Sequence, residues 1–173
     1  VLDNVSCTEP VFRDADIVGL DMKSLSWQAT ADPLKGHPNG LDSRTICALT
    51  RYAGISDRLS FIGIHELPTT PMMDQLLAQM VWYFLEGFSL RYNEYPVAVN
   101  EGFIKYSVTL SDQTMVFYKS EKSQRWWLEL TNDSHLNNKL KKATLIACTQ
   151  NDYVSATHDD VPERWYNAVR RMY

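Results

Sequence analysis

The fold of this chain is decided by residues 16–26, which read DIVGLDMKSLS. The first half of this stretch is a short apolar run, and Asp21 stands where the run ends. A short apolar run is typical of a strand buried in a parallel sheet, and ligands bind at the carboxyl ends of the strands in open α/β sheets. The sequence therefore predicts a strand over 16–21 that delivers Asp21 to a ligand-binding edge.

Three positions after the run have the spacing of a metal motif. A hard divalent cation such as manganese needs several oxygen or imidazole ligands, and a D-x-D-x-x-D run would supply three carboxylates from one strand end. Here those positions hold Asp21, Lys23 and Ser26. The lysine ammonium competes with a cation, and serine replaces a carboxylate poorly. Asp21 is either a residual metal ligand or a strand-end aspartate that caps the following loop.

Beyond this site the pattern continues as loop, helix and strand. A long loop rich in Pro, Gly, Asp and Asn spans 22–41, and loops of this length are often functional. Helical spacing of apolar residues then predicts a helix over 43–53, capped by Asp42 or Ser43 and stopped by Gly54. An apolar run over 59–66 predicts the next strand. Residues 16–66 thus form one right-handed βαβ unit.

The helix predicted most strongly begins at Pro71 and ends near Arg91, with one apolar stripe along it. Trp82 and Tyr83 widen its apolar surface, which predicts burial on more than one side. Asp and Glu residues interrupt the stretch, so it does not have the composition of a membrane span.

The last part of the chain has β character. Alternating residues over 103–110 and 114–119 predict a hairpin, and 125–130 and 143–148 predict further short strands. A short helix is expected after Pro162. We expect two domains, an α/β domain over 1–95 and a β-rich appendage over 96–173 packed on it.

The order of these motifs resembles the carboxyl-terminal half of the arginase, agmatinase and formiminoglutamase (ureohydrolase) family. The resemblance rests on the strand ending in Asp21, the turn Pro38-Asn39-Gly40-Leu41, and the strand ending in Ile64-His65-Glu66-Leu67-Pro68, and it covers about residues 14–92. It implies an α/β three-layer, parallel-sheet (arginase-like) fragment with a C-terminal β-hairpin-rich extension.

The same resemblance implies roles for individual residues. Asp21 matches the first metal-ligand aspartate, whereas Lys23 and Ser26 occupy ligand positions without matching them. Glu66 matches the carboxylate that engages a guanidinium or amidine group, and Asn39 in the turn is the second substrate-binding candidate. An aspartate expected before Glu66 is replaced by Gly63. The family's remaining ligands lie upstream of anything in this sequence.

Three functions follow as hypotheses. The first is a non-catalytic ureohydrolase-like protein that binds a ligand or a partner, in which the Lys23 ammonium replaces the metal's charge and pairs with Asp21 or Glu66. The second is a manganese-dependent hydrolase of linear amidine C–N bonds, in a guanidino or formimino substrate, completed by an absent upstream portion; the chemistry would need a hydroxide bridging two metal ions. The third is an assembly module that pairs through a free sheet edge.

Composition narrows the choice of partners. The chain has 173 residues, 45% of them hydrophobic, and a net charge of -4. Binding to nucleic acid or to an anionic membrane surface needs clustered Lys and Arg residues, so an acidic chain of this kind is not expected to bind either. Three widely spaced cysteines indicate reduced, mostly buried thiols and favour a cytoplasmic protein. The start at Val1 without a signal segment suggests a piece of a longer protein, and self-association or an upstream segment is expected to complete the sheet.

For several other residues we expect a structural role rather than a functional one. His65 is expected to be a core histidine, because its neighbour Glu66 points to the opposite face. His37, His135 and His158 form no ligand spacing, and Cys47 is expected to be an inert helix residue. Trp126 and Trp127 are predicted to pack the appendage against the helix at 72–90 rather than to form a stacking platform for a sugar or base.

Overall fold

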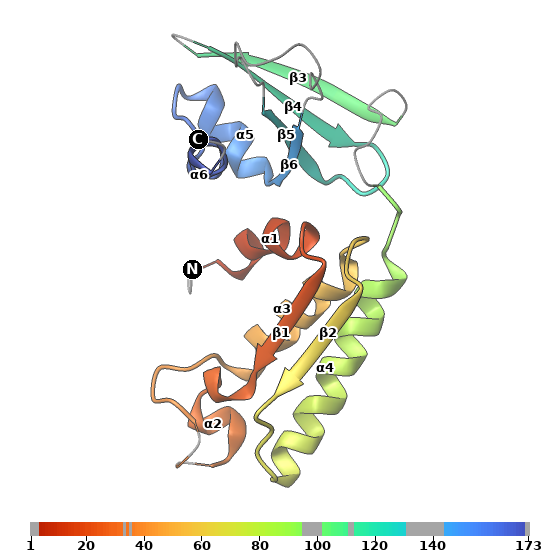
Figure 1. Cartoon of the computed structure of the whole chain (residues 1–173), viewed down its shortest axis with the longest axis vertical. Helices are drawn as coiled ribbons and strands as arrows, with labels where there is room; N and C mark the ends of the chain where they lie inside the picture. Colours follow the sequence, from red (N-terminus) through yellow and green to blue (C-terminus); the bar gives the residue numbers. More distant parts are fainter. Residues whose placement is uncertain are drawn as a thin grey trace. The chain divides into compact units, whose positions relative to one another are not determined.

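The structure is a computed structural model, which describes residues 4–32, 34, 36–94, 102–110, 113–130 and 144–171. The described residues divide into two compact units, one within residues 1–95 and one within 96–173. The first contains a parallel two-stranded sheet and the second an antiparallel four-stranded sheet (Figure 1). The chain is therefore of mixed α/β class. The expected packing of the second part on the first stays a prediction.

The first unit contains the predicted order of strand, loop, helix and strand. Strand β1 (Ile17–Asp21) pairs in parallel with β2 (Phe61–His65), from Ile17 opposite Phe61 to Asp21 opposite His65, and α3 (Ser43–Ile55) connects them. Helix α4 (Pro71–Ser89) follows β2. The long connection after β1 is not a plain loop, because it contains the 3-10 helix η2 (Met22–Ser24) and α2 (Trp27–Thr30). Before β1 lie η1 (Val5–Thr8) and α1 (Glu9–Arg13).

One face of this small sheet is buried and the other is open. Val18 and Leu20 alternate inward from β1 and join the core with Ile62 and Ile64, against residues of α3 and α4. The opposite face carries Ile17, which is 70% exposed. The described part of the first unit therefore has two layers, and the expected three-layer arrangement stays a prediction. The apolar run resembled a strand covered on both faces, but only every second side chain of β1 is buried.

Helices α3 and α4 approach each other through two glycines. A Cβ atom added at Gly54 would lie 2.2 Å from the Phe84 carbonyl oxygen, and one at Gly87 would lie 2.2 Å from the Arg51 carbonyl oxygen. The expectation that Gly54 stops α3 is therefore wrong, because the helix continues to Ile55. Gly54 is needed for the close approach of two backbones and not for a left-handed cap.

The caps of the two helices follow the sequence closely. The Asp42 carboxylate accepts a hydrogen bond from the Thr45 amide at 2.6 Å at the start of α3. At the start of α4, the Thr70 hydroxyl accepts from the Met73 amide at 3.2 Å and donates to the Thr30 carbonyl at 2.9 Å. Pro71 follows in the first turn, where its missing N–H costs nothing. Thr70 thus ties α4 to the end of α2.

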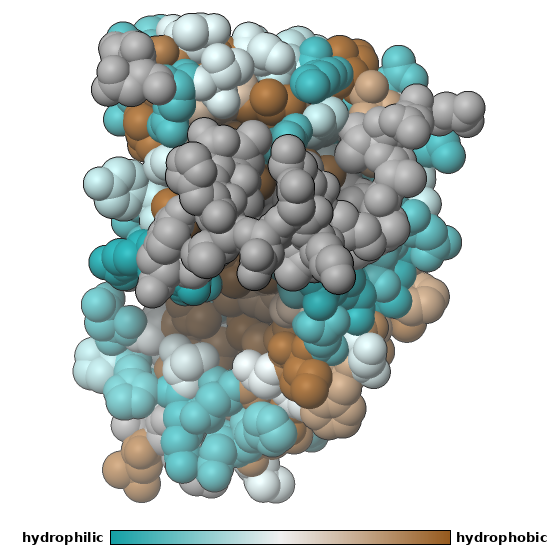
Figure 2. Space-filling view, turned by 45° about the horizontal axis from the view of Figure 1, so that its top comes forward, coloured by the Kyte–Doolittle hydropathy of each residue, from teal (hydrophilic) through white to brown (hydrophobic). Residues whose placement is uncertain are grey.

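Only one side of α4 is buried. Met73, Leu76 and Met80 lie in the core of the first unit, whereas Trp82 is 71% exposed. The expectation of burial on more than one side is therefore wrong in the described part of the chain. Both units expose large apolar side chains among hydrophilic ones (Figure 2).

The second unit is a sheet in the order β3-β4-β5-β6, antiparallel throughout. Its strands are β3 (Phe103–Thr109), β4 (Thr114–Ser120), β5 (Trp126–Leu130) and β6 (Thr144–Cys148), and its helices are α5 (Gln150–Thr157) and α6 (Glu163–Arg170). The predicted hairpin, the two further strands and the final helix are thereby confirmed. Helix α5 was not predicted.

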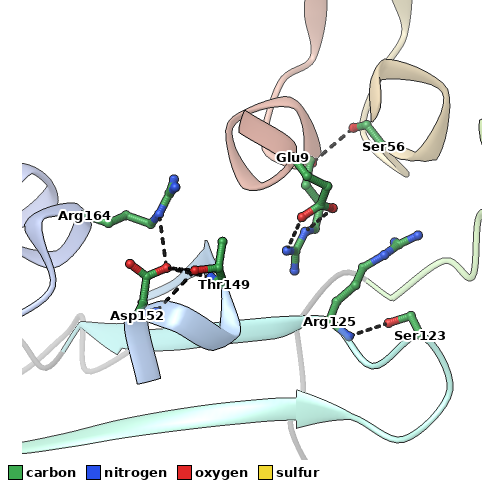
Figure 3. Close-up of polar contacts among 8 residues, drawn as sticks. Glu9, Ser56, Ser123, Arg125, Thr149, Asp152 and Arg164 are labelled. Carbon is green, nitrogen blue, oxygen red and sulfur yellow. Dashed lines mark hydrogen bonds and ion pairs between the residues drawn. The ribbon is translucent and has the colours of Figure 1, made fainter. Parts of the chain in front are cut away.

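Helix α5 has a local signal for its start. The Thr149 hydroxyl accepts from the Asp152 amide at 3.3 Å, and the Asp152 carboxylate accepts from the Thr149 amide at 2.7 Å (Figure 3). This reciprocal pair is a capping box. The Arg164 guanidinium on α6 lies 3.7 Å from the same carboxylate and thereby links the two helices (Figure 3).

Aromatic rings join α5 to the sheet of the second unit. The ring of Tyr153 stacks on that of Trp126 with centroids 5.0 Å apart and meets the edge of Phe117. Trp127, on the other face of β5, is also buried and packs edge-on against Phe103. Neither tryptophan forms an exposed stacking platform. Trp126 packs against α5 of its own unit, and packing against α4 stays a prediction.

Candidate functional site

The candidate site lies where β1 and β2 end. The parallel register places Asp21 opposite His65, so Glu66 follows directly beyond the last pair of the ladder. Lys23 lies in η2, which follows β1 directly. The edge predicted from the sequence therefore brings Asp21, Lys23 and Glu66 to one end of the sheet.

Asp21 has the role of a cap. Its carboxylate accepts a hydrogen bond from the Lys23 amide at 2.9 Å, and its carbonyl accepts one from the Ser24 hydroxyl at 2.6 Å. These contacts turn the chain out of β1 into η2. Of the two alternatives open for Asp21, the structure provides the cap directly. The carboxylate remains exposed.

Lys23 and Glu66 form an ion pair across the two strand ends. The Lys23 Nζ atom lies 3.1 Å from Glu66 Oε2, and both side chains are 56% exposed. One of the two pairings expected for Lys23 is therefore present. Because water screens an exposed pair, its contribution to the stability of the fold is about 0–1 kcal/mol. The pair therefore contributes little to stability, but it holds a positive and a negative charge side by side at this edge of the sheet.

Glu66 has an unusual backbone. Its φ is 58°, in the left-handed region that residues with a Cβ atom seldom adopt. Such a conformation costs on the order of 1 kcal/mol and, where it occurs, motivates a functional hypothesis. The sequence offered no signal for it, because neither Asn nor Gly stands at this position.

The other two predicted residues lie apart from the ion pair. Ser26 is buried, and its hydroxyl caps α2 by accepting from the Ala29 amide at 3.4 Å. Asn39 is exposed in the turn closed by the Gly40 amide on the His37 carbonyl at 3.2 Å. The substrate-binding role of Asn39 stays a prediction.

Two glycines hold that turn tightly against the start of α2. A Cβ atom at Gly40 would lie 2.4 Å from the Leu25 carbonyl carbon, and one at Gly36 would lie 2.3 Å from Trp27 Cα. The Leu41 amide donates to the Ser24 carbonyl at 2.8 Å, and the His37 amide donates to the Leu25 carbonyl at 3.0 Å. The loop that resembles the family's glycine-rich turn is thus anchored beside η2.

The donor groups present do not fit a manganese pair. Among the described residues, no three His, Cys, Asp or Glu side chains gather as a metal site would require. At the three motif positions, Asp21 caps a turn, Lys23 brings a cation, and Ser26 is buried in a helix cap. A binuclear site needs several anionic or imidazole donors around each ion. This end of the sheet supplies a cation instead.

His65 is not the core histidine that the sequence predicted. It is exposed on the open face of the sheet, and its Nε2 atom would lie 2.9 Å from a Cβ atom added at Gly63. Its imidazole therefore lies over the glycine backbone of β2. The error has a physical reason, because the open face removes the cover that a core histidine requires. Glycine within a strand was the available signal for such a close approach.

The remaining polar candidates form no second site in the part that the structure describes. His37 and His158 are exposed and far apart in the sequence, and His135 lies outside the described residues. Cys47 and Cys148 are buried, as expected, whereas Cys7 is exposed. Burial raises the pKa of the Cys47 thiol, which keeps it protonated and unreactive.

Comparisons with known proteins add little to this geometry. No protein-family model matches the sequence, and no curated protein matches it. Among solved structures, the chain is similar to formimidoylglutamase from Bacillus subtilis subsp. subtilis str. 168, with 20% sequence identity and a TM-score of 0.40, over 44% of this chain and 25% of that one. The chain thus spans a quarter of that protein's length. A TM-score this low does not show a shared fold.

No described helix is both long enough and apolar enough to cross a membrane. The cytoplasmic location expected from the cysteines stays a prediction.

Proposed function

We propose that this chain is a non-catalytic, arginase-like module that binds a ligand or partner at the carboxyl ends of β1 and β2. The observation that carries the proposal is the 3.1 Å ion pair between Lys23 and Glu66. It places an ammonium where the family motif has a carboxylate ligand. A strongly hydrated cation at that position opposes the entry of a divalent metal ion.

The chemistry of the family explains why this exchange removes catalysis. Attack on an amidine carbon needs a water that two metal ions have deprotonated. The lysine ammonium supplies charge but activates no water. What remains is Glu66, whose carboxylate can accept hydrogen bonds from a guanidinium or amidine group. The proposed ligand is therefore a guanidino or amidino compound that competes with Lys23 for this carboxylate.

Binding can be tested separately from catalysis. We would record amide chemical shifts of the chain during titration with arginine, and compare Glu66→Gln with the control Glu163→Gln, an exposed carboxylate on α6. The proposal predicts saturable shifts around residues 63–66 in the wild type and the control, and their loss in Glu66→Gln. Equal shifts in all three proteins, or no shifts in the wild type, would contradict the binding of a guanidino ligand at Glu66.

The rival function is a manganese-dependent hydrolase of linear amidine C–N bonds whose missing ligands come from upstream. It predicts a manganese-dependent release of product from guanidino or formimino substrates by the full-length gene product. That activity would disappear in Asp21→Ala. Its detection would replace the non-catalytic proposal, since the Lys23–Glu66 pair would then have to open for catalysis.

A role in assembly is supported by a separate observation. In the described part of the chain, β1 and β2 pair only with each other, so each strand has an unpaired outer edge. Unpaired edges of parallel strands tend to acquire further strands. Completion of this sheet by a second copy or by an upstream segment therefore remains part of the proposal.

A further inference from the structure

The outer side of α4 carries a second apolar stripe that the core does not use. It consists of residues that are spaced three or four apart and exposed: Ala78, Val81, Trp82, Leu85 and Phe88. This spacing places their side chains on one face of the helix. The core face of α4, with Met73, Met80 and Gly87, lies on another side of the helix. Helix α4 runs along the side of the first unit (Figure 1).

A contiguous apolar stripe on an exposed helix is a feature of interaction surfaces. Within the stripe, Trp82 is the most exposed of the large side chains, at 71%, and Leu85 follows at 56%. Tryptophan is also the residue type that most often anchors a protein interface. The stripe therefore has the features of a protein-interaction surface, with Trp82 at its middle.

The charged residues at the two ends of the stripe favour a second copy of this chain as the partner. Asp74 lies in the first turn of α4, eight residues before Trp82, and Arg91 lies nine residues after it. Arg91 lies two residues beyond the end of α4, and its guanidinium stacks 4.3 Å from the ring centre of Phe88, so it lies beside that end of the stripe. None of the ion pairs within the described residues contains Asp74 or Arg91, although Arg91 Nε donates to the Gly54 carbonyl at 2.8 Å.

These charges are self-complementary in one orientation. If two copies of α4 pack antiparallel with a two-fold axis near Trp82, Asp74 of each copy reaches Arg91 of the other, because both stand about 12–14 Å from the axis along the helix. Antiparallel packing also sets opposite ends of the helix dipoles together. Parallel packing would put like charges against each other.

We propose that the chain forms a two-fold dimer through the outer stripe of α4, with Trp82 of each copy at the axis. The proposal does not rest on the ligand site at Glu66, which lies before α4. The proposed dimer uses a face of α4, whereas completion of the sheet would use the outer edges of β1 and β2. A variant that disrupts one of these two interfaces should therefore leave the other intact.

Sedimentation velocity over a range of micromolar concentrations tests the dimer. The wild-type chain should dimerise, and Trp82→Glu should raise the dissociation constant by about tenfold or more, since a central tryptophan is removed and a charge is placed at the axis. Trp82 is exposed, so the variant should keep the far-ultraviolet circular dichroism of the wild type. Asp74→Lys should also weaken the dimer, whereas Gln79→Lys, on the polar side of α4, should not.

Cross-linking tests the orientation. In a Cys7→Ser background, Trp82→Cys should form a disulfide between two copies on mild oxidation, and Ala78→Cys should not, because antiparallel packing separates the two copies of residue 78. Cross-linking of both variants would contradict the antiparallel arrangement. A wild-type chain that stays monomeric, or a dimer unaffected by Trp82→Glu, would overturn the proposal and leave the stripe to a different protein or to another part of a longer chain.

Discussion

The Lys23 ammonium and the Glu66 carboxylate meet 3.1 Å apart at the carboxyl ends of two parallel strands. The two residues come from different connections, since Lys23 follows β1 and Glu66 follows β2. They reach each other because the strands are in register and because Glu66 turns in a left-handed conformation. The pair places a positive and a negative charge together at this edge of the sheet.

The left-handed backbone of Glu66 can be measured through stability. Glu66→Gly should be more stable than Glu66→Ala by about 1 kcal/mol, because both variants lose the ion pair but only glycine adopts this conformation without strain. Urea unfolding of the two variants gives the difference directly. If alanine is as stable as glycine, Glu66 is not strained in solution.

The glycines between α3 and α4 should tolerate no side chain. Gly54→Ala is expected to lower the free energy of unfolding by about 1–3 kcal/mol, because the added methyl group would overlap a backbone oxygen and force the helices apart. Gly19→Ala is the matched control, since the nearest atom to an added Cβ there is 3.8 Å away. An equal loss in both variants would show that close packing of α3 and α4 is not the cause.

The Asp42 cap should make the stability of the first unit depend on pH. Backbone and side-chain hydrogen bonds from Thr45 lower the pKa of Asp42 from its usual 3.8. A lowered pKa in the folded state means that the cap contributes fully above pH 3.8 and loses its contribution as the pH falls through the lower folded value. Asp42→Ala should cost about 1 kcal/mol at neutral pH and less in acid.

Asp42→Asn provides the control for that experiment. Asparagine keeps a capping oxygen but does not titrate in this range. Its difference from wild type should therefore change as the pH falls below 3.8. A difference that stays constant across the acid range would contradict the assignment of Asp42 as the titrating cap.

In the second unit, the Tyr118 phenol should lose its proton at a higher pH than an ordinary tyrosine does. Burial, as the larger cause, and the hydrogen bond that its hydroxyl donates to the Glu129 carboxylate at 2.7 Å together raise its pKa from 10.0 to about 12. Because the folded pKa is raised, the associated stability is complete below pH 10 and is lost between pH 10 and about 12. Ultraviolet titration of wild type minus Tyr118→Phe isolates this phenol among the nine tyrosines.

Removing the acceptor separates the two causes. In Glu129→Gln the pKa of Tyr118 should fall but remain above 10, because burial is the larger cause. A Tyr118 that titrates at its usual value in this variant would mean that the carboxylate, and not burial, controls the group.

The sequence predicted those parts of the fold that depend on local patterns. The apolar run before Asp21, the cap at Asp42 and the proline at the start of α4 each specify an element through neighbouring residues. The capping box at Thr149 and Asp152 was an equally local signal for α5, and it was overlooked. Short helices such as α2 lack the periodicity that makes longer helices recognisable.

The errors concern contacts between distant segments. Gly54 has the position of a helix stop in the sequence, and only its meeting with α4 reveals a packing role. His65 and Trp82 were expected to be buried, but burial depends on which layers surround them. Within the candidate site, the spacing from Asp21 to Ser26 indicated the end of the sheet at which Lys23 and Glu66 pair, and the function of that end stays a prediction. The pairing of Lys23 was left open between two acidic partners until the geometry placed Glu66 beside it.

The central claim is that Lys23 has replaced a metal ion at this edge. Its most direct test is the manganese content of the full-length gene product after equilibration with the metal and gel filtration, measured by inductively coupled plasma mass spectrometry. We predict that no manganese is retained in stoichiometric amount. Two ions per chain, reduced in Asp21→Ala, would contradict the claim and identify a working metal site completed by residues outside this sequence.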